Sequence, residues 1–509
     1  MLNVILGPPG TGKTETSIRT VEKFLEQGVL PSLIGYFAFT RRANIEAKHR
    51  AMTRFNLSSN DLPYFRTLHS LAYSQLGISR SQIMTRKHYD EVSKWLKIGS
   101  FFARESDHGP FKDIGYGDKF LELINMARIT QRPLKDIYNA SRVRYKADWR
   151  LVDYVNRGLS HYKSTYHLLD YTDMLVQFVK ADLAPRLEVV IIDEAQDLSA
   201  LQWQMVTLLA NKAQHVFIAG DDDQAIYRWA GADIDKFLQL EGNISVLSKS
   251  YRIPAKHHRI SQRLIQRVTH RHVKNFSPRD EEGHLQWHRH SEQVDLHNGG
   301  WLLLSRTTKG ANQLEEEVRQ RGHLYTYDSS RSTDSKALQA VILWEKLRKG
   351  IKLPVEDIHK IYAQMLLHTQ IVYGYKTLSN INVDGFYNIT DLQTDHGLLT
   401  TDPWDEALGK ISNRDKRYIS ACLRKGEDLT KTPRITISTI HRAKGAQAEN
   451  VLLLTDTTGR SNSQWRFSET EKEDEARVFY VGLTRAKQTL HLIHPMYSAG
   501  YSIPHGGKS

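Results

Sequence analysis

The chain has little cysteine and no long apolar run. Cys422 is the single cysteine among 509 residues, which excludes an intrachain disulfide framework and is typical of a reducing compartment. No apolar run approaches the roughly 18 residues that a membrane-spanning helix requires, and a strand-like run at the very start leaves no room for a signal peptide. These absences predict a soluble cytoplasmic protein in which Cys422 is a small core residue.

The histidines do not form the pattern of a zinc site. No cysteine accompanies them, and their spacing differs from that of closed zinc sites. We interpret them as solvated or phosphate-adjacent side chains, and the residues concerned are His257, His258, His270, His272, His284, His288 and His290.

Acidic residues are fewer than basic ones. The 70 Lys and Arg against 57 Asp and Glu give a formal charge of +13, with an isoelectric point near 9.4. A basic balance favours a polyanionic partner. Charge alone is also compatible with a generally solvated surface, so the assignment depends on the motifs.

A glycine-rich segment near the start has the pattern of a phosphate-binding loop. The sequence GPPGTGKT follows the apolar run Leu2–Leu6 and precedes a helical pattern. Glycines let backbone N–H groups turn toward phosphates, Lys13 can reach the β and γ oxygens, and the Thr14 hydroxyl can hold Mg²⁺. The predicted nucleotide-binding residues are Gly7, Pro8, Pro9, Gly10, Thr11, Gly12, Lys13 and Thr14.

Two adjacent carboxylates follow another apolar run. The segment VVIIDEAQD, residues 189–197, is typical of a buried parallel strand that ends at Asp193 and Glu194. Phosphoryl transfer requires mainly positioning and charge neutralisation from the protein. We therefore expect Asp193 to hold Mg²⁺ through water and Glu194 to polarise the attacking water.

A third segment combines an amide with aromatic residues. In GDDDQAIYRWAGAD, residues 220–233, Gln224 precedes Tyr227 and Trp229. The amide can hydrogen-bond a terminal phosphate, and the aromatic faces can stack on the bases of a single strand. Taken alone, both aromatics could equally be core residues. Beside the other two segments, the pattern favours a phosphate sensor linked to a stacking platform.

With these residues in place, the chain resembles a superfamily 1 helicase of the UvrD/Rep type, in order from end to end. The resemblance implies that Tyr251 stacks on adenine and that Arg252 and Arg485 reach the γ-phosphate. The fixed fork of donors on arginine suits phosphate oxygens, which supports these roles. The other segments that resemble family motifs are FAFTRRA (37–43), TLHS (67–70), YTDML (171–175), SYRIP (250–254), TISTIHRAKG (436–445) and EARVFYVGLTRAK (475–487).

The resemblance also implies a path for a nucleic-acid strand and two departures from the family pattern. Ala230 stands where the family often has arginine, and Gln447 stands where it often has a ribose-contacting glutamate. We expect these changes to affect strand grip or nucleotide discrimination without removing hydrolysis. The residues expected along the strand path are Phe39, Arg41, His69, Tyr227, Trp229 and His441.

The predicted fold is α/β, with two RecA-like P-loop NTPase cores of parallel sheets flanked by helices and a mainly helical insertion in each core. Strand-like runs at 2–6, 33–40, 187–193 and 216–221 alternate with helical patterns, which is typical of a doubly wound sheet. We assign 1–74 and 167–243 to the first core, 75–166 to its insertion, 244–327 and 433–509 to the second core, and 328–432 to a short second insertion. Runs at 244–247, 301–305, 451–454, 478–481 and 490–493 are interpreted as strands of the second core.

The sequence thus predicts an ATP- and Mg²⁺-dependent translocase on single-stranded DNA and a 3′-to-5′ DNA helicase, as the resemblance implies. Its partners would be single-stranded DNA, single/double-strand junctions and a loading, replication or repair protein, without a membrane. Two alternatives stay open. One is a protein-displacing or RNA-directed translocase with little duplex unwinding. The other is a nucleic-acid-sensing regulatory ATPase, which the short second insertion slightly favours and against which the full set of Lys13, Glu194, Gln224, Arg252 and Arg485 argues.

Overall fold

The computed structural model describes residues 2–98, 101, 116–145, 147–378, 381–457, 468–495 and 500–504. The chain forms two compact units, and neither unit is continuous in sequence. The first unit contains Met1–Arg252, Arg267–Arg279 and Glu473–Arg477, and the second contains Ile253–Gln266, Asp280–Lys472 and Val478–Ser509.

The first unit contains a six-stranded sheet in the order β3-β2-β4-β5-β1-β6, and every neighbouring pair is parallel. All residues of β2 and β4 are buried, as expected for strands that are covered on both faces. The strands are β1 (Leu2–Leu6), β2 (Ile34–Ala38), β3 (Phe65–Arg66), β4 (Val189–Asp193), β5 (His215–Gly220) and β6 (Asn243–Val246).

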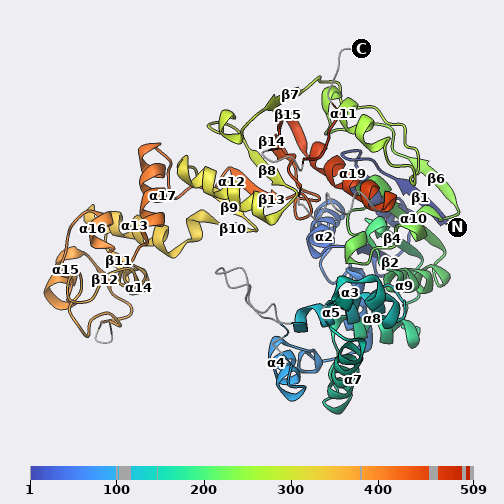
Figure 1. Ribbon diagram of the computed structural model, residues 1–509, viewed down its shortest axis with the longest axis horizontal. Coiled ribbons are helices and arrows are strands. Elements are labelled where there is room, and N and C mark those ends of the chain that lie inside the picture. Colours follow the sequence, from blue (N-terminus) through green and yellow to red (C-terminus); the bar gives the residue numbers. More distant parts are fainter. Residues whose placement is uncertain are drawn as a thin grey trace. The chain divides into compact units, whose positions relative to one another are not determined.

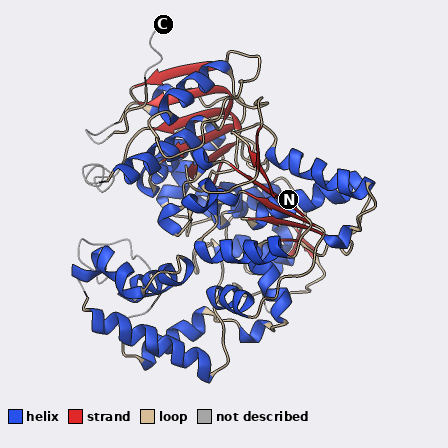
Figure 2. Ribbon diagram, turned by 90° about the vertical axis from the view of Figure 1, so that its right-hand side faces the viewer, coloured by secondary structure: helices blue, strands red, loops and turns tan. Residues whose placement is uncertain are grey.

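Helices cover both faces of this sheet (Figure 2). Alternate residues of β4 point to opposite faces, so Ile191 packs in one apolar cluster with α1 and α2, and Ile192 packs in another with α3, α8 and α9. The helices of this layer are α1 (Lys13–Glu26), α2 (Arg41–Phe55), α3 (Leu68–Leu76), α8 (Tyr171–Lys180), α9 (Ala200–Asn211) and α10 (Ile234–Leu238).

The first insertion is helical, as predicted, and has its own apolar cluster. The helix-compatible stretches at 120–128 and 149–162 lie in α5 and α7. Leu96, Phe120, Ile124, Val155 and Leu159 are buried together in this cluster. The insertion helices are α4 (Arg86–Trp95), α5 (Tyr116–Ile129), α6 (Leu134–Ala140) and α7 (Trp149–Thr165).

The second unit contains a seven-stranded sheet in the order β10-β9-β13-β8-β14-β15-β7. All pairs are parallel except the short edge pair β9 and β10. The strands are β7 (His284–His288), β8 (Trp301–Ser305), β9 (Tyr325–Tyr327), β10 (Ser330–Arg331), β13 (Ile435–Thr439), β14 (Ala448–Leu454) and β15 (Ala486–Ile493). Three helices lie before or between these strands in sequence: α11 (Ala255–Ile265), α12 (Thr308–Gln320) and α19 (Glu469–Leu483). The predicted α/β class with parallel sheets flanked by helices is confirmed.

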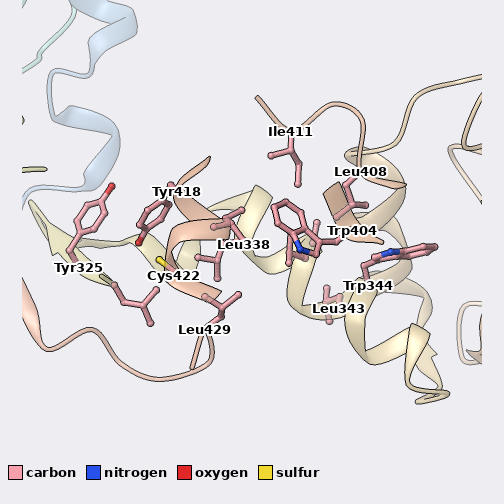
Figure 3. Close-up of a cluster of buried hydrophobic side chains, with 14 of the residues drawn as sticks. Tyr325, Leu338, Leu343, Trp344, Trp404, Leu408, Ile411, Tyr418, Cys422 and Leu429 are labelled. Atoms are coloured by element: carbon pink, nitrogen blue, oxygen red, sulfur yellow. The ribbon is translucent and has the colours of Figure 1, made fainter. Parts of the chain in front are cut away.

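The second insertion shares an apolar core with this sheet (Figure 3). Tyr325 of β9 lies near Tyr418 and Cys422 of α17, and the same cluster continues to Trp344 and Trp404 (Figure 3). Cys422 is fully buried, which confirms its prediction as a core residue. The elements of the insertion are α13 (Lys336–Arg348), β11 (Leu353–Pro354), α14 (Val355–Ala363), β12 (Phe386–Tyr387), α15 (Ile389–Asp395), α16 (Trp404–Ala407) and α17 (Asn413–Arg424), and several are labelled in Figure 1.

Two predicted strands of the second core were wrong. The run at 244–247 forms β6, which pairs with β1 at the edge of the first sheet. The run at 478–481 lies inside α19, where the Ser468 side chain caps the helix and Glu469 and Glu471 suit its first turn. The predicted core boundary at residue 244 is also replaced, because the first unit continues to Arg252 and takes in 267–279 and 473–477.

No helix in the described ranges combines the length and apolar composition that crossing a membrane requires.

Candidate active site

The glycine-rich loop connects the end of β1 to the start of α1 in the first unit. Its entry is fixed because the Gly7 N–H donates to the Gly220 carbonyl at 2.9 Å. Gly12, at φ +87, precedes Lys13, the first residue of α1. The backbone N–H groups at the start of a helix attract anions, so this geometry suits a phosphate-binding loop.

The segment Ser250–Arg252 packs directly on this loop. The Tyr251 N–H donates to the Gly10 carbonyl at 2.8 Å, and the Ser250 hydroxyl donates to the Pro9 carbonyl at 2.8 Å. A Cβ on Gly10 would lie 2.4 Å from the Arg252 Cβ and 2.8 Å from the Ser250 Oγ. The loop therefore requires glycine here, and it lies against two of the residues predicted to contact the nucleotide.

Replacing Gly10 by alanine is expected to weaken nucleotide binding about tenfold, because the new methyl group would push the loop away from Ser250 and Arg252. Gly28→Ala is the matched control, since Gly28 is also at positive φ but has no atom within 4 Å of the added Cβ. Both variants carry a backbone strain of about 1 to 2 kcal/mol, so only the contact differs. Titration with a fluorescent ATP analogue measures the affinity, and equal affinities in the two variants would contradict the role of the contact.

Arg252 has features of an anion-binding side chain. Its Nε–H is buried and has no acceptor among the described residues. Burial lowers the pKa of Arg252 below its ordinary value, and the nearby Glu194 carboxylate acts in the opposite direction. A buried guanidinium stays charged and gains from an anionic partner. Tyr251 beside it is 73% exposed, which leaves its ring free for stacking.

Lys13 is buried and paired with Glu194. The Lys13 Nζ lies 3.4 Å from the Glu194 Oε1. A Cβ on Gly7 would lie 1.9 Å from the Lys13 Cγ, so the absence of a side chain at Gly7 makes room for the lysine. Burial acts to lower the pKa of Lys13, but Glu194, Asp221 and Asp193 together raise it above the ordinary value. The amine therefore stays protonated and suited to phosphate oxygens.

Asp193 is buried at the end of β4 with hydroxyl partners. The Tyr36 hydroxyl donates to the Asp193 Oδ2 at 2.7 Å, and the Thr14 hydroxyl donates to the same oxygen at 3.4 Å. Burial and the charge of Glu194 raise the pKa of Asp193, while Lys13 opposes the rise. A divalent cation would relieve this cost, and the oxygen donors of Thr14 and Asp193 fit Mg²⁺. Tyr36 was not anticipated from the sequence.

Glu194 is positioned by a buried amide that sequence reasoning missed. The Gln196 Nε2 donates to the Glu194 Oε2 at 2.6 Å, and the Gln196 Oε1 accepts from the Asp221 N–H at 2.9 Å. Gln196 is fully buried, whereas 29% of the Glu194 side chain is exposed. Glu194 also has φ +55, a strained conformation for a non-glycine residue that is typical of functional sites. The sequence did contain a signal for this contact, because the amide of Gln196 stands two residues after the carboxylate pair.

Asp221 connects the Glu194 carboxylate to Gln224, the predicted phosphate sensor. The Gln224 Nε2 donates to the Asp221 Oδ2 at 2.7 Å, so Gln196, Asp221 and Gln224 form a hydrogen-bonded series from Glu194. The Lys274 Nζ lies 3.3 Å from the Asp221 Oδ1, and the lysine is fully buried. The sensor is therefore held in a defined position in the first unit.

Basic residues distant in sequence neutralise the acidic triplet 221–223. Lys274 pairs with Asp222 at 2.5 Å and with Asp223 at 3.1 Å, and Arg271 makes two hydrogen bonds of 2.6 Å to Asp223. Arg477 donates through Nε to the Asp222 carbonyl at 3.1 Å. The sequence did not predict Arg271, Lys274 and Arg477, because no motif joins these residues to the triplet and they are distant from it in sequence.

Among the residues predicted for the strand path, the first unit brings Phe39 and Tyr227 together. Their ring centroids are 5.8 Å apart, and Trp229, two residues later, is 67% exposed. Arg41 is exposed at the start of α2. His69 is half-buried, and burial lowers its pKa, so the imidazole is neutral at pH 7. The exposed indole of Trp229 is suited to stacking on a base.

The second unit carries Arg485, Gln447 and His441. Arg485 is buried and donates through Nε to the Val481 carbonyl at 2.8 Å and through Nη1 to the Ala446 carbonyl at 3.4 Å, which brings it next to exposed Gln447. Burial, with Arg306 and Lys444, lowers the pKa of His441 to about 4. In sequence, His441 follows β13, Gln447 immediately precedes β14, and Arg485 immediately precedes β15.

Comparison with known proteins gives matches over both units. Residues 2–245 match the family described as UvrD/REP helicase N-terminal domain, and residues 434–493 match the UvrD-like helicase C-terminal domain. Together the two matches cover more than half of the chain. The ATP-dependent DNA helicase PcrA of Bacillus subtilis (strain 168) is 21% identical over 598 residues, covering 96% of this chain and 80% of that protein. DNA helicase II of Rickettsia typhi (strain ATCC VR-144 / Wilmington) is 23% identical over 603 residues, covering 96% of this chain and 89% of that protein.

Proposed function

Because the chain belongs to the UvrD/REP helicase family, we propose that it is an ATP-dependent DNA helicase that moves 3′ to 5′ along single-stranded DNA. One observation carries the catalytic part of this proposal. In the first unit, Lys13, the pair Asp193 and Glu194, and Arg252 gather around the glycine-rich loop. This is the arrangement of charges that transfer of a γ-phosphoryl group to water requires.

Each residue in this cluster has a proposed role in hydrolysis. Lys13 and Arg252 would bind the β- and γ-phosphates, and Thr14 and Asp193 would hold Mg²⁺. The bound Mg²⁺ would supply charge neutralisation on the phosphate oxygens. Glu194 would orient and polarise the attacking water, while Gln196 holds its carboxylate. Arg485 of the second unit would add a second guanidinium to the γ-phosphate, and Tyr251 and Gln447 would contact the adenosine.

The hydrogen-bonded series from Glu194 to Gln224 supports a coupling between hydrolysis and strand binding. Gln224 lies three residues before Tyr227, whose ring adjoins Phe39. A shift of Gln224 toward a γ-phosphate would break its bond to Asp221 and move the backbone that carries Tyr227 and Trp229. Strand grip by these aromatics, with Arg41, His69 and His441, would then depend on the nucleotide.

The test is ATP hydrolysis measured without nucleic acid and with single-stranded DNA, duplex DNA or RNA, with Glu194→Gln as the blank. Stimulation by single-stranded DNA that vanishes in the blank is expected, followed by unwinding of a tailed duplex with one polarity only. Greater stimulation by RNA would replace the DNA assignment. Slow turnover that no nucleic acid changes would contradict the motor and favour a regulatory ATPase.

Trp229→Ala is expected to raise about tenfold the concentration of single-stranded DNA that half-stimulates hydrolysis, because one stacked base contributes roughly 1–3 kcal/mol. Basal hydrolysis should change less than twofold, since Trp229 makes no part of the phosphate site. Trp95→Ala is the matched control, because Trp95 is 54% exposed on α4 of the helical insertion. An equal loss of basal and stimulated rates in Trp229→Ala would contradict the coupling role.

A further inference from the structure

The end of α5 in the helical insertion contacts the turn that carries Tyr227 and Trp229. This platform turn comprises residues 227–233, and Gly231 within it has φ +95. A Cβ on Gly231 would lie 2.6 Å from the Ile129 Cδ1 and 3.4 Å from the Met126 Sδ. These two side chains of α5 therefore lie directly against the backbone next to Trp229.

Hydrogen bonds from the first unit hold the far end of the platform turn. The Asp233 N–H donates to the Leu198 carbonyl at 2.8 Å, and the Trp203 Nε1 donates to the Asp233 carbonyl at 3.3 Å. These bonds act four residues after Trp229, whereas the contact with α5 acts at Gly231, two residues after it. The contact with α5 is thus the nearer of the two supports to the indole.

An ion-pair cluster fixes the end of α5. Arg128, the residue before Ile129, donates through Nη1 to the Asp170 Oδ2 at 2.7 Å and through Nη2 to the Asp170 Oδ1 at 3.1 Å. The same Nη2 also donates to Asp173. Lys163 of α7 donates to Asp170 and to Asp173, at 2.7 Å in each case. The cluster therefore joins α5 and α7 of the insertion to the start of α8, which lies beside α5 (Figure 1).

The two carboxylates have fixed positions and stay charged. The Asp170 N–H donates to the Asp173 Oδ2 at 2.9 Å, and the Asp173 N–H donates to the Asp170 Oδ1 at 2.7 Å, which forms a capping box on α8. Burial acts to raise the pKa of Asp170, but Arg128 and Lys163 together lower it below its ordinary value. A bidentate arginine–carboxylate pair fixes direction as well as distance, so the cluster determines where α5 ends.

We propose that Arg128 is a positioning residue for strand binding, which acts on Trp229 through the contact of Ile129 with Gly231. The ion pairs hold the end of α5, and Ile129 in turn holds the platform turn in the conformation that presents the indole for stacking. Both terminal nitrogens of Arg128 donate to carboxylates, which favours an indirect role over contact with a phosphate. A movement of the insertion relative to α8 would then change the affinity for the strand.

The proposal rests on the proposed function, because it takes Trp229 to stack on a base. Two variants test it. Arg128→Ala removes the anchor, and Ile129→Ala keeps the ion pairs but removes the contact with Gly231, so the second variant decides the matter if the first does not fold. The matched control is Arg157→Ala, which removes an arginine that pairs with Asp153 at 2.9 Å on α7 of the same insertion.

The first measurement is the concentration of single-stranded DNA that half-stimulates ATP hydrolysis, with the basal and maximal rates. Arg128→Ala and Ile129→Ala are each expected to raise this concentration about fivefold, less than the roughly tenfold for loss of the stacking side chain itself. Their basal and maximal rates should equal those of Arg157→Ala. In a Trp229→Ala background neither change should have a further effect, because residues that act through one side chain are not additive.

An equal fold-change with and without Trp229 would overturn the proposal, and so would a concentration equal to that of Arg157→Ala. The second measurement, amide hydrogen exchange at residues 227–233 without nucleic acid, does not depend on activity. Exchange there should be several-fold faster in both variants than in the control, and unchanged exchange in both would also overturn the proposal. A full chain that single-stranded DNA does not stimulate would instead refute the proposed function, and exchange would still decide whether Arg128 positions the platform turn.

Discussion

The Glu194→Gln variant is expected to hydrolyse ATP about 10³-fold more slowly than the unmodified protein while still binding the nucleotide. An amide has the same shape as the carboxylate but cannot polarise the attacking water, and loss of a general base typically costs between about 10² and 10⁴ in rate. The Gln196 Nε2 can still donate to the new side-chain carbonyl, so the local structure should persist.

The Glu194→Gln change also alters the pKa of Lys13. The amine loses the partner at 3.4 Å that contributes most to raising its pKa, so that pKa should fall toward its ordinary value, and Lys13 should remain protonated at pH 7. Nucleotide affinity should therefore change less than the rate. Glu188→Gln is the matched control, since Glu188 lies immediately before β4, at the opposite end of the strand from Glu194. Single-turnover hydrolysis and equilibrium binding measure the two effects, and a rate within tenfold of the control would exclude Glu194 as the base.

Arg252→Ala is expected to reduce the rate of hydrolysis by about 10³, comparable to the loss of an arginine that stabilises the transition state of phosphoryl transfer. The buried guanidinium has a donor without an acceptor among the described residues and is held against the glycine-rich loop. Its contribution should therefore appear mainly when charge develops on the γ-phosphate. ATP affinity should fall less than the rate.

Arg252→Lys separates charge from geometry at this position. Lysine keeps the positive charge but lacks the planar fork, so it should restore only part of the lost rate. Measurement of the rate constant and of ATP affinity for both variants distinguishes a transition-state role from ground-state binding. If ATP affinity and rate fell in equal proportion in Arg252→Ala, Arg252 would be a binding residue only.

The parts of the site that the sequence predicted are those encoded locally. The loop of residues 7–14 lies between an apolar run and a helix, and the structure has β1 and α1 at those places. The same holds for β4 and the carboxylates that follow it. Glycines, apolar runs and strand-end carboxylates identify these features because each requires its residues next to one another in sequence.

Other features could not be predicted because they depend on distant partners. In the sequence, Tyr36 resembles the apolar residues of its strand, but its hydroxyl donates to Asp193. Lys274 lies in a segment without a motif, yet it is buried among three carboxylates. The four residues of β6 have an alternating pattern that either sheet could accept, so pairing with β1 could not be read from the sequence. The apolar run at 478–481 likewise fits a strand until the cap at Ser468 is taken into account.

The discontinuity of the first unit has a consequence for synthesis on the ribosome. The bond from Arg477 to the Asp222 carbonyl joins residues 255 positions apart. At about 5–20 residues per second, Arg477 is made roughly 10 to 50 seconds after Asp222. Until Arg271 and Lys274 emerge, the carboxylates of Asp221, Asp222 and Asp223 lack the cations that neutralise them in the folded protein. Fragments that end after β6 are therefore expected to remain incompletely folded and to bind chaperones. Gln224, the predicted phosphate sensor, should reach its final position only when nearly the whole polypeptide has been released.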